Sequence, residues 1–298
     1  MTTMIALVGE QPMPVLLPAL YLKPAETILV ATTETKLVAE RLTKLIKASR
    51  HIEVKPYEIT STVQTLDKEL AGKKDIIVNL TGGTKTMAIA AFALVARTKT
   101  EFVYFQTEKE TVLKRYQFTE QGLSSKARER NLPDLISAAD YLNAHLPGFR
   151  QEGFSKDETG QLSFGGKFEK CVYDALKKSG FEVLAGVRPE GVGDQIEIDL
   201  VIRLGNRVGI AEVKMGDKEG KRPKSGIDQL STAGSREYLG TYTSKFLILA
   251  NRLPKSLHKL AGEKKVTVID TLNYLDGQPL STTDTGRLAN IIKEKLTR

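Results

Sequence analysis

The chain contains very little cysteine and histidine, and this scarcity excludes several kinds of site. Its 298 residues include one cysteine and three histidines. With Cys171 alone, no intramolecular disulfide bond and no cysteine-rich metal site can form. The histidines, His51, His145 and His258, lie far apart in the sequence. The sequence therefore gives no support to a histidine-based zinc site or to a Ser-His-Asp triad.

Long hydrophobic runs are also missing. A helix that crosses a bilayer needs about 20 mostly apolar residues, and no uninterrupted apolar run reaches that length. The first residues, Met1–Ala6, lack the basic region of a signal peptide, and Glu10 and several prolines interrupt the next apolar residues. We therefore expect a cytoplasmic protein with no membrane partner.

Positive charge is in modest excess. The formal net charge of the chain is +8 at pH 7. Such a balance favours a polyanionic partner such as nucleic acid, although many proteins with no nucleic-acid role share it. The length suits two domains.

The order of apolar segments predicts two α/β domains. Strand and helix patterns alternate over residues 4–118, which is typical of a mostly parallel, Rossmann-like sheet covered by helices. Residues 126–146 have the pattern of a connecting helix, and residues 147–161 are glycine-rich and polar. We expect a first domain at 1–147 and a second at 148–298, where further strands alternate with helices.

A hairpin in the second half brings two carboxylates together. Gly205-Asn206 separates two β-rich runs and suits a two-residue turn, because both residue types tolerate positive φ. If Leu204 pairs with Arg207, counting outward places Asp199 opposite Glu212. Side chains alternate along a strand, so Lys214 shares the face of Glu212.

Two opposed carboxylates repel each other. A divalent metal ion between them would turn this repulsion into a binding site, and a lysine beside it could hold a phosphate or orient a water. The plain alternative is a solvated strand face, on which an acid and a lysine two residues apart arise by chance.

The layout of Asp199, Glu212 and Lys214 resembles the core of the PD-(D/E)xK nucleases. The resemblance implies Mg²⁺ or Mn²⁺ bound by Asp199, Glu212 and the backbone carbonyl of Val213, with Lys214 positioning a water or offsetting phosphate charge. Nucleases of this fold often place a metal-linked Glu on the first helix, where Glu169 fits, and some use a Gln such as Gln229 to orient the lysine. A surface role on a helix explains Glu169 and Gln229 equally well.

The first half contains a second candidate site. In the run from Ile76 to Ala88, a buried strand ends at Leu80, Thr81-Gly82-Gly83-Thr84-Lys85 follows, and an alanine-rich helix begins. Glycines allow close backbone approach, and a helix N-terminus attracts anions. The run fits neither the P-loop pattern nor Gly-x-Gly-x-x-Gly. A simple strand-to-helix turn with a threonine cap is the structural alternative.

This run resembles the Asn-Leu-Thr-Gly-Gly-Thr-Lys-x-Met segment of CARF domains, the Rossmann-like sensors of cyclic oligoadenylate in type III CRISPR defence. The resemblance extends over most of residues 1–130. It implies a homodimer in which two sensor domains share one cyclic ligand. The family's ligand contacts correspond here to Gln11, Thr33, Glu34, Thr81, Gly82, Gly83, Thr84 and Lys85.

Together the two resemblances imply a nuclease that cyclic tetra-adenylate activates and that cleaves DNA or RNA with a divalent metal. Two alternatives remain open. The chain could bind or degrade the messenger beside a non-cleaving nucleic-acid-binding domain. It could also be a stand-alone nuclease that ignores cyclic oligoadenylate.

Overall fold

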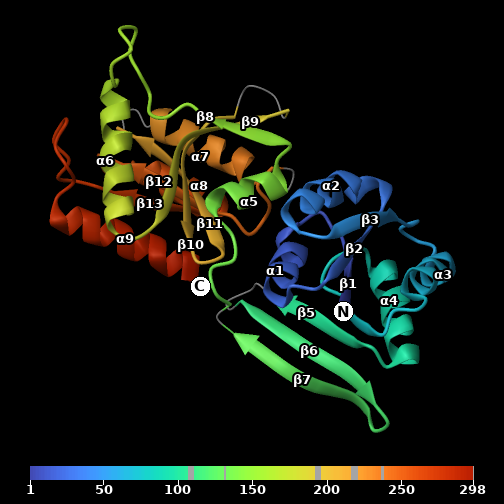
Figure 1. Cartoon of the computed structure of the whole chain (residues 1–298). Coiled ribbons are helices and arrows are strands. Elements are labelled where there is room, and N and C mark those ends of the chain that lie inside the picture. The colour runs from blue at the N-terminus through green and yellow to red at the C-terminus, as the bar shows by residue number, and fades with distance from the viewer. Residues whose placement is uncertain (107–110, 131, 192–195, 216–220, 236–237, 298) are drawn as a thin grey trace. The chain divides into compact units, whose positions relative to one another are not determined.

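The computed structural model of the chain describes residues 1–106, 111–130, 132–191, 196–215, 221–235 and 238–297. It divides into two compact units, Met1–Leu135 and Ile136–Arg298, each built around its own sheet (Figure 1). None of the helices in these ranges is both long enough and apolar enough to cross a membrane.

The first unit is built on a seven-stranded sheet in the order β3-β2-β1-β4-β5-β6-β7. Strands β1 to β5 run parallel, and β6 and β7 add an antiparallel hairpin at one edge. The elements are β1 (Thr2–Leu7), α1 (Met13–Leu22), β2 (Glu26–Ala31), the 3₁₀ turn η1 (Thr33–Thr35), α2 (Lys36–Leu45), β3 (Ser49–Glu53), α3 (Ile59–Leu70), β4 (Asp75–Asn79), α4 (Lys85–Thr98), β5 (Glu101–Gln106), β6 (Val112–Thr119) and β7 (Gly122–Arg130).

Helices cover both faces of the parallel part of this sheet. Alternate residues of β1 and β2 pack in one core with Leu66 and Leu70 of α3 and with Met87 and Leu94 of α4. Helices α1 and α2 lie on the opposite side (Figure 1). The sequence predicted this layered arrangement, which is confirmed. Strand β6 pairs antiparallel with β5.

The second unit has a six-stranded mixed sheet in the order β13-β12-β11-β10-β9-β8. Its elements are α5 (Ala138–His145), β8 (Gly148–Gln151), α6 (Phe164–Lys178), β9 (Glu182–Glu190), β10 (Ile198–Leu204), β11 (Arg207–Lys214), α7 (Lys221–Ala233), β12 (Ser244–Leu249), α8 (Lys255–Glu263), β13 (Val266–Asp270) and α9 (Thr282–Thr297).

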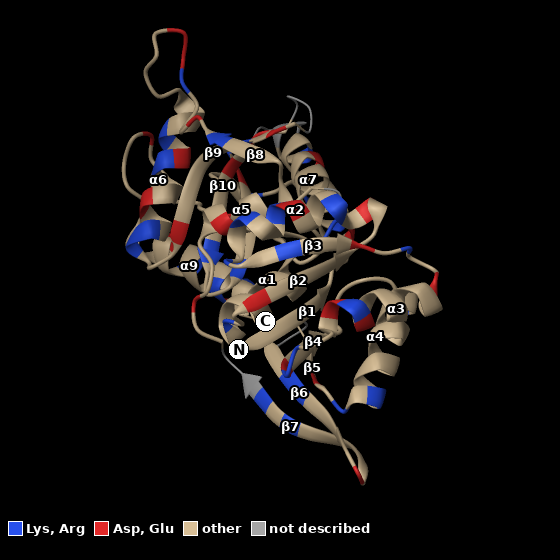
Figure 2. Cartoon of the chain, turned by 45° about the vertical axis from the view of Figure 1, so that its right-hand side comes forward, with Lys and Arg blue, Asp and Glu red and all other residues tan. Residues whose placement is uncertain are grey.

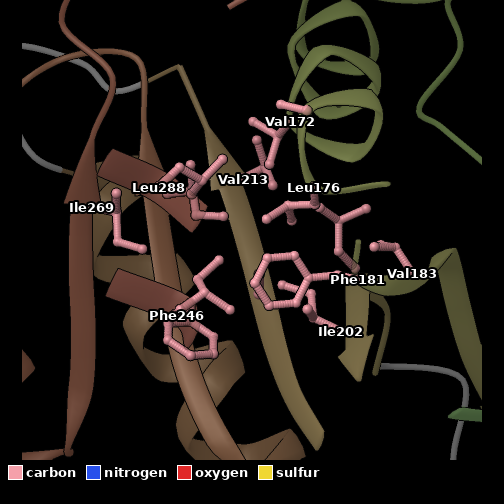
Figure 3. Packing of buried hydrophobic residues seen from close by; sticks show 14 of the residues in the cluster. Val172, Leu176, Phe181, Val183, Ile202, Val213, Phe246, Ile269 and Leu288 are labelled. Carbon is pink, nitrogen blue, oxygen red and sulfur yellow. The ribbon is translucent and has the colours of Figure 1, made fainter. Parts of the chain in front are cut away.

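The main core of this unit lies between the sheet and the helix pair α6 and α9. Val172 and Leu176 of α6 and Leu288 of α9 pack against Val213 and Phe246 of the central strands (Figure 3). The opposite faces of β11 and β12 carry Glu212, Lys214 and Leu247, and α7 lies against them. Alternation along β11 thus separates the apolar core from the charged residues.

The predicted connecting helix over residues 126–146 is wrong in its first half. Residues up to Arg130 form strand β7, and the helix α5 begins only at Ala138. Ser137 starts it, because its hydroxyl oxygen accepts a hydrogen bond from the Asp140 amide, 3.0 Å away. The sequence patterns also missed α8.

Helix α5 packs on the second sheet, so the division between the units falls at Leu135 instead of residue 147. The buried hydroxyl of Tyr141 anchors the helix, because it donates to the Leu239 carbonyl at 2.9 Å.

Candidate functional site

The turn at Gly205-Asn206 sets the register of β10 and β11, the strands that carry the candidate metal site. Gly205 has φ of +61°, and Leu204 pairs with Arg207 as the sequence predicted. The paired residues of the two strands extend to Leu200 opposite Ala211. Asp199 and Glu212 are the next residues outward on the two strands, on the face that points away from the apolar core.

The Lys214 ammonium lies next to both carboxylates. Its Nζ is 3.2 Å from Asp199 Oδ2 and 2.7 Å from Glu212 Oε2. Asp199 Oδ2 also accepts a hydrogen bond of 2.7 Å from the Val213 amide. The side chains of Asp199 and Glu212 are 9% and 2% exposed, so water contributes little to their solvation. The predicted trio is therefore assembled, with the lysine in contact with both acids.

One ammonium does not balance two buried carboxylates. Burial and, after it, the charge of Asp199 raise the pKa of Glu212 well above its ordinary value. Burial alone would lower the pKa of Lys214, but the charges of Glu212 and Asp199 outweigh it and raise that pKa. Lys214 is the only charged donor close to Glu212 Oε2 among the described residues, and it is shared with Asp199. Two buried carboxylates that share one ammonium fit a divalent cation with oxygen ligands.

Glu169 lies nearby on α6, but its oxygens have other partners. Oε2 accepts from the Ser155 amide at 3.0 Å and Oε1 from the Ser155 hydroxyl at 2.8 Å. Burial and then the charge of Asp199 raise the pKa of Glu169. Within the described ranges, no three His, Cys, Asp or Glu side chains are gathered as in a metal centre. Glu169 thus stands beside the carboxylate pair, without direct contact with it.

Helix α7 closes the other side of the site. A Cβ atom on Gly226 would lie 3.6 Å from both Glu212 Cβ and Lys214 Cγ, so the helix backbone packs directly on these side chains. Gln229, one turn further along α7, is exposed. The sequence patterns did not indicate Gly226 or Ser155, because neither belongs to a recognisable motif.

The candidate ligand loops of the first unit meet where the strand order reverses. Strand β1 lies between β2 and β4, and the loops after β1 and β4 leave the same edge of the sheet. Such a reversal is where open α/β sheets bind ligands. A Cβ on Gly82 would stand 2.0 Å from the Leu7 carbonyl oxygen, and one on Gly9 3.2 Å from the Gly83 amide. Only glycine at position 82 allows these loops to pack backbone against backbone.

The two threonines of the Thr81–Lys85 run have structural partners. Thr81 Oγ1 donates to the buried Asn79 side chain at 2.6 Å and accepts from the Phe105 amide at 2.8 Å. Thr84 caps α4, since its hydroxyl oxygen accepts from the Met87 amide at 3.2 Å. Lys85 is exposed at the N-terminus of the same helix, which leaves its charge available to an anion.

The remaining predicted ligand residues lie in the loops after β1 and β2. Both Gln11 amide atoms are buried and have no hydrogen-bond partner among the described residues. Thr33 is exposed and its hydroxyl donates to Glu53 at 2.9 Å. Glu34 is exposed, and a hydrogen bond from the Thr32 hydroxyl lowers its pKa. Gln11 is the residue of this group whose hydrogen-bonding capacity is unused.

The sheet order and the glycine-packed loops define a Rossmann-like α/β domain with an open switch point. Residues 3–141 match the family model of the Card1 CARF domain. These residues therefore form a CARF domain, as the sequence resemblance predicted. No curated protein matches the chain.

Two solved structures match nearly the whole chain. Can2 from Sulfobacillus thermosulfidooxidans, in complex with cyclic tetra-adenylate, has 17% identity and a TM-score of 0.74, covering 99% of both chains. Protein VC1899 from Vibrio cholerae has 10% identity and a TM-score of 0.72, covering 99% of this chain and 98% of its own. The predicted fold class, a CARF domain followed by a second α/β domain, is confirmed.

A third similar structure is longer. It is a type III CRISPR defence DNA nuclease activated by cyclic oligoadenylate, with 16% identity and a TM-score of 0.60. The match covers 97% of this chain and 51% of that one. At these identities the likeness concerns the fold alone.

Proposed function

We propose that this protein is a metal-dependent nuclease of type III CRISPR defence. We propose that its activator is a cyclic oligoadenylate, namely cyclic tetra-adenylate. The observation that carries the proposal is the buried set of Asp199, Glu212 and Lys214 on adjacent strands, with a surplus negative charge. Similar folds in Can2 bound to cyclic tetra-adenylate and in a DNA nuclease activated by cyclic oligoadenylate support it.

Asp199 and Glu212 would hold Mg²⁺ or Mn²⁺, with the Val213 carbonyl as a third ligand. The Val213 amide points toward Asp199, and the N–H and C=O of one strand residue point to the same side. The bound ion supplies an acidified water and stabilises charge at the scissile phosphate. Lys214, in contact with both acids, neutralises phosphate charge and orients the attacking water. Glu169 supports this arrangement from α6.

In the sensor unit, the loops after β1 and β4 would bind the ligand. Lys85 attracts phosphate, the α4 N-terminus offers its dipole, and Gln11 supplies a donor and an acceptor. Activation requires that the ligand bind the active arrangement of the protein more tightly than the resting one.

A homodimer would provide the second half of the ligand site. Helix α4, which begins at the ligand loop, exposes Ile89 and Phe92 to 55% and 41%. Two large apolar side chains one turn apart on a helix fit an interface with the same helix of a second copy.

Along the described elements drawn in Figure 2, positions of Lys and Arg alternate with positions of Asp and Glu. The nucleic-acid substrate is therefore better identified by assay than by charge. Supercoiled plasmid, single-stranded DNA and single-stranded RNA should be incubated with Mn²⁺ or Mg²⁺, with and without cyclic tetra-adenylate.

Cleavage that requires both ligand and metal, and that Glu212→Ala abolishes while ligand affinity stays unchanged, is the expected result. Cleavage by Glu212→Ala would contradict the metal site. Ligand-independent cleavage would favour a stand-alone nuclease, and ligand binding without any cleavage would favour a binding module.

A further inference from the structure

A short segment before α6 is fixed at both ends by backbone hydrogen bonds. The Glu152 amide donates to the Gly186 carbonyl of β9 at 2.8 Å, and the Ser163 amide donates to the Ser155 carbonyl at 2.9 Å. Residues 152–155 are thereby held between β9 and the start of α6.

Two glycines make room for this segment. A Cβ on Gly166 would stand 2.0 Å from the Ser155 carbonyl oxygen, and one on Gly186 would stand 1.9 Å from the Gly153 carbonyl oxygen. Contacts this short exclude any larger residue without movement of the backbone. The backbone is therefore closely packed at Ser155, against Gly166, and at Gly153, against Gly186.

From this position Ser155 holds the whole carboxylate of Glu169. Its amide donates to Oε2 at 3.0 Å and its hydroxyl to Oε1 at 2.8 Å. Two donors, one to each oxygen, fix both the direction and the plane of the carboxylate. Glu169 is 6% exposed, so water does not compete well for these oxygens.

The Glu169 carboxylate is close enough to the candidate metal site to interact with its charges. The charges of Asp199 and Lys214 both act on Glu169. Each Glu169 oxygen accepts one of these two hydrogen bonds, which leaves lone pairs for a metal ion or a metal-bound water. Hydrogen-bond partners of metal-binding residues typically change metal affinity by about 10- to 100-fold when they are removed.

We propose that Ser155 is a positioning residue that orients Glu169 toward the Asp199–Glu212 pair and thereby sets the affinity of this site for Mg²⁺ or Mn²⁺. This inference rests on the proposed metal-dependent function. It adds a residue that lies outside the motif of Asp199, Glu212 and Lys214.

The test is Mn²⁺ binding measured by calorimetry on the full chain, without nucleic acid or cyclic ligand. Ser155→Ala keeps the backbone donor and loses the hydroxyl, so we expect Mn²⁺ affinity to fall about 10-fold. Ser155→Thr retains both donors at a position that is exposed. Its affinity should stay near that of the original protein.

Ser163→Ala, at the N-cap of the helix that carries Glu169, is the matched control. The Ser163 hydroxyl accepts from the Gly166 amide at 3.0 Å and thereby caps α6, so its role is in the helix start and not in the carboxylate of Glu169. This variant should melt at a lower temperature and bind Mn²⁺ with unchanged affinity. A comparison of melting temperatures thus separates loss of stability from loss of orientation.

The outcomes are distinguishable. Equal Mn²⁺ affinity of Ser155→Ala and the original protein would overturn the positioning role alone, as would a Ser155→Thr variant as weak as Ser155→Ala. Absence of Mn²⁺ binding by the original protein would overturn the proposed metal-dependent function together with this inference.

Discussion

Removal of the Lys214 ammonium should destabilise the second unit strongly in the absence of metal. Lys214→Ala leaves Asp199 and Glu212, both buried, without the cation that lies 3.2 and 2.7 Å from them. Breaking a buried ion pair typically costs about 3–5 kcal/mol, because a charge remains buried without compensation. The Lys214 side chain is 24% exposed, so we expect the lower end, about 3 kcal/mol.

The assay is thermal unfolding followed by circular dichroism in a chelator at pH 8. For a unit of this size, about 3 kcal/mol corresponds to a fall in Tm of about 6–12 °C. The control is Lys259→Ala. Lys259 pairs with Glu263 at 3.9 Å on the surface of α8, with the two side chains 88% and 61% exposed. Such a pair contributes at most about 0.5 kcal/mol, so this variant should melt almost normally.

The stability of Lys214→Ala should increase as the pH falls. The folded-state pKa of Glu212 lies above its unfolded value, so the folded protein binds this proton more tightly. Stability from this group is present near pH 4.5 and is lost as pH rises through the folded pKa. Acidification from pH 8 toward pH 5 should therefore restore part of the lost Tm in Lys214→Ala.

Two further changes, added Mn²⁺ and a second substitution, should restore part of the stability that Lys214→Ala loses. Mn²⁺ can supply the missing positive charge, and at 100 times its Kd it would contribute about 2.7 kcal/mol. The double variant Lys214→Ala/Glu212→Gln should also melt higher than Lys214→Ala, because one of the two opposed charges is gone. A Tm for Lys214→Ala within about 2 °C of the original protein in chelator at pH 8 would refute the charge balance described for this site.

Three other predictions concern the sensor unit. Gln11→Met should raise the Tm of the ligand-free protein by a few degrees, because two buried polar atoms without partners among the described residues are removed. The same variant should bind cyclic tetra-adenylate more weakly in calorimetry. A lower Tm would mean that the Gln11 amide has partners. Lys85→Ala should weaken ligand binding about 10-fold, or about 1.4 kcal/mol, and shift activation to higher ligand concentration, whereas an unchanged dose response would place the pocket elsewhere. Ile89→Glu should convert a dimer to a monomer in sedimentation experiments without loss of helix content; an unchanged dimer would exclude the exposed face of α4 as the interface.

Much of the fold could be predicted because its signals are local. Alternating apolar runs indicate the strands and helices of both units, and Gly205-Asn206 specifies the turn that sets the register of β10 and β11. That register alone places Asp199 near Glu212. The chain also shows where local signals mislead, since residues 126–130 have helix-compatible residues but pair as a strand with β6.

The orientation of Glu169 illustrates what local signals leave open. Glu169 lies on α6, which follows α5 in the second unit. Its carboxylate accepts two hydrogen bonds from Ser155, fourteen residues earlier, in a segment whose backbone packs closely on Gly166 and Gly186. Nothing in the local sequence around Glu169 predicts that contact.

By itself, the sequence determined the two-domain α/β organisation, the carboxylate-bearing hairpin and the Thr-Gly-Gly-Thr-Lys loop, because each depends on periodicity or on a turn within a few residues. The tertiary structure decided that α5 belongs to the second unit, that α7 packs on Glu212 and Lys214 through Gly226, and that Lys214 contacts both acids. These features depend on packing between segments far apart in the chain, where side-chain volume and burial set the distances.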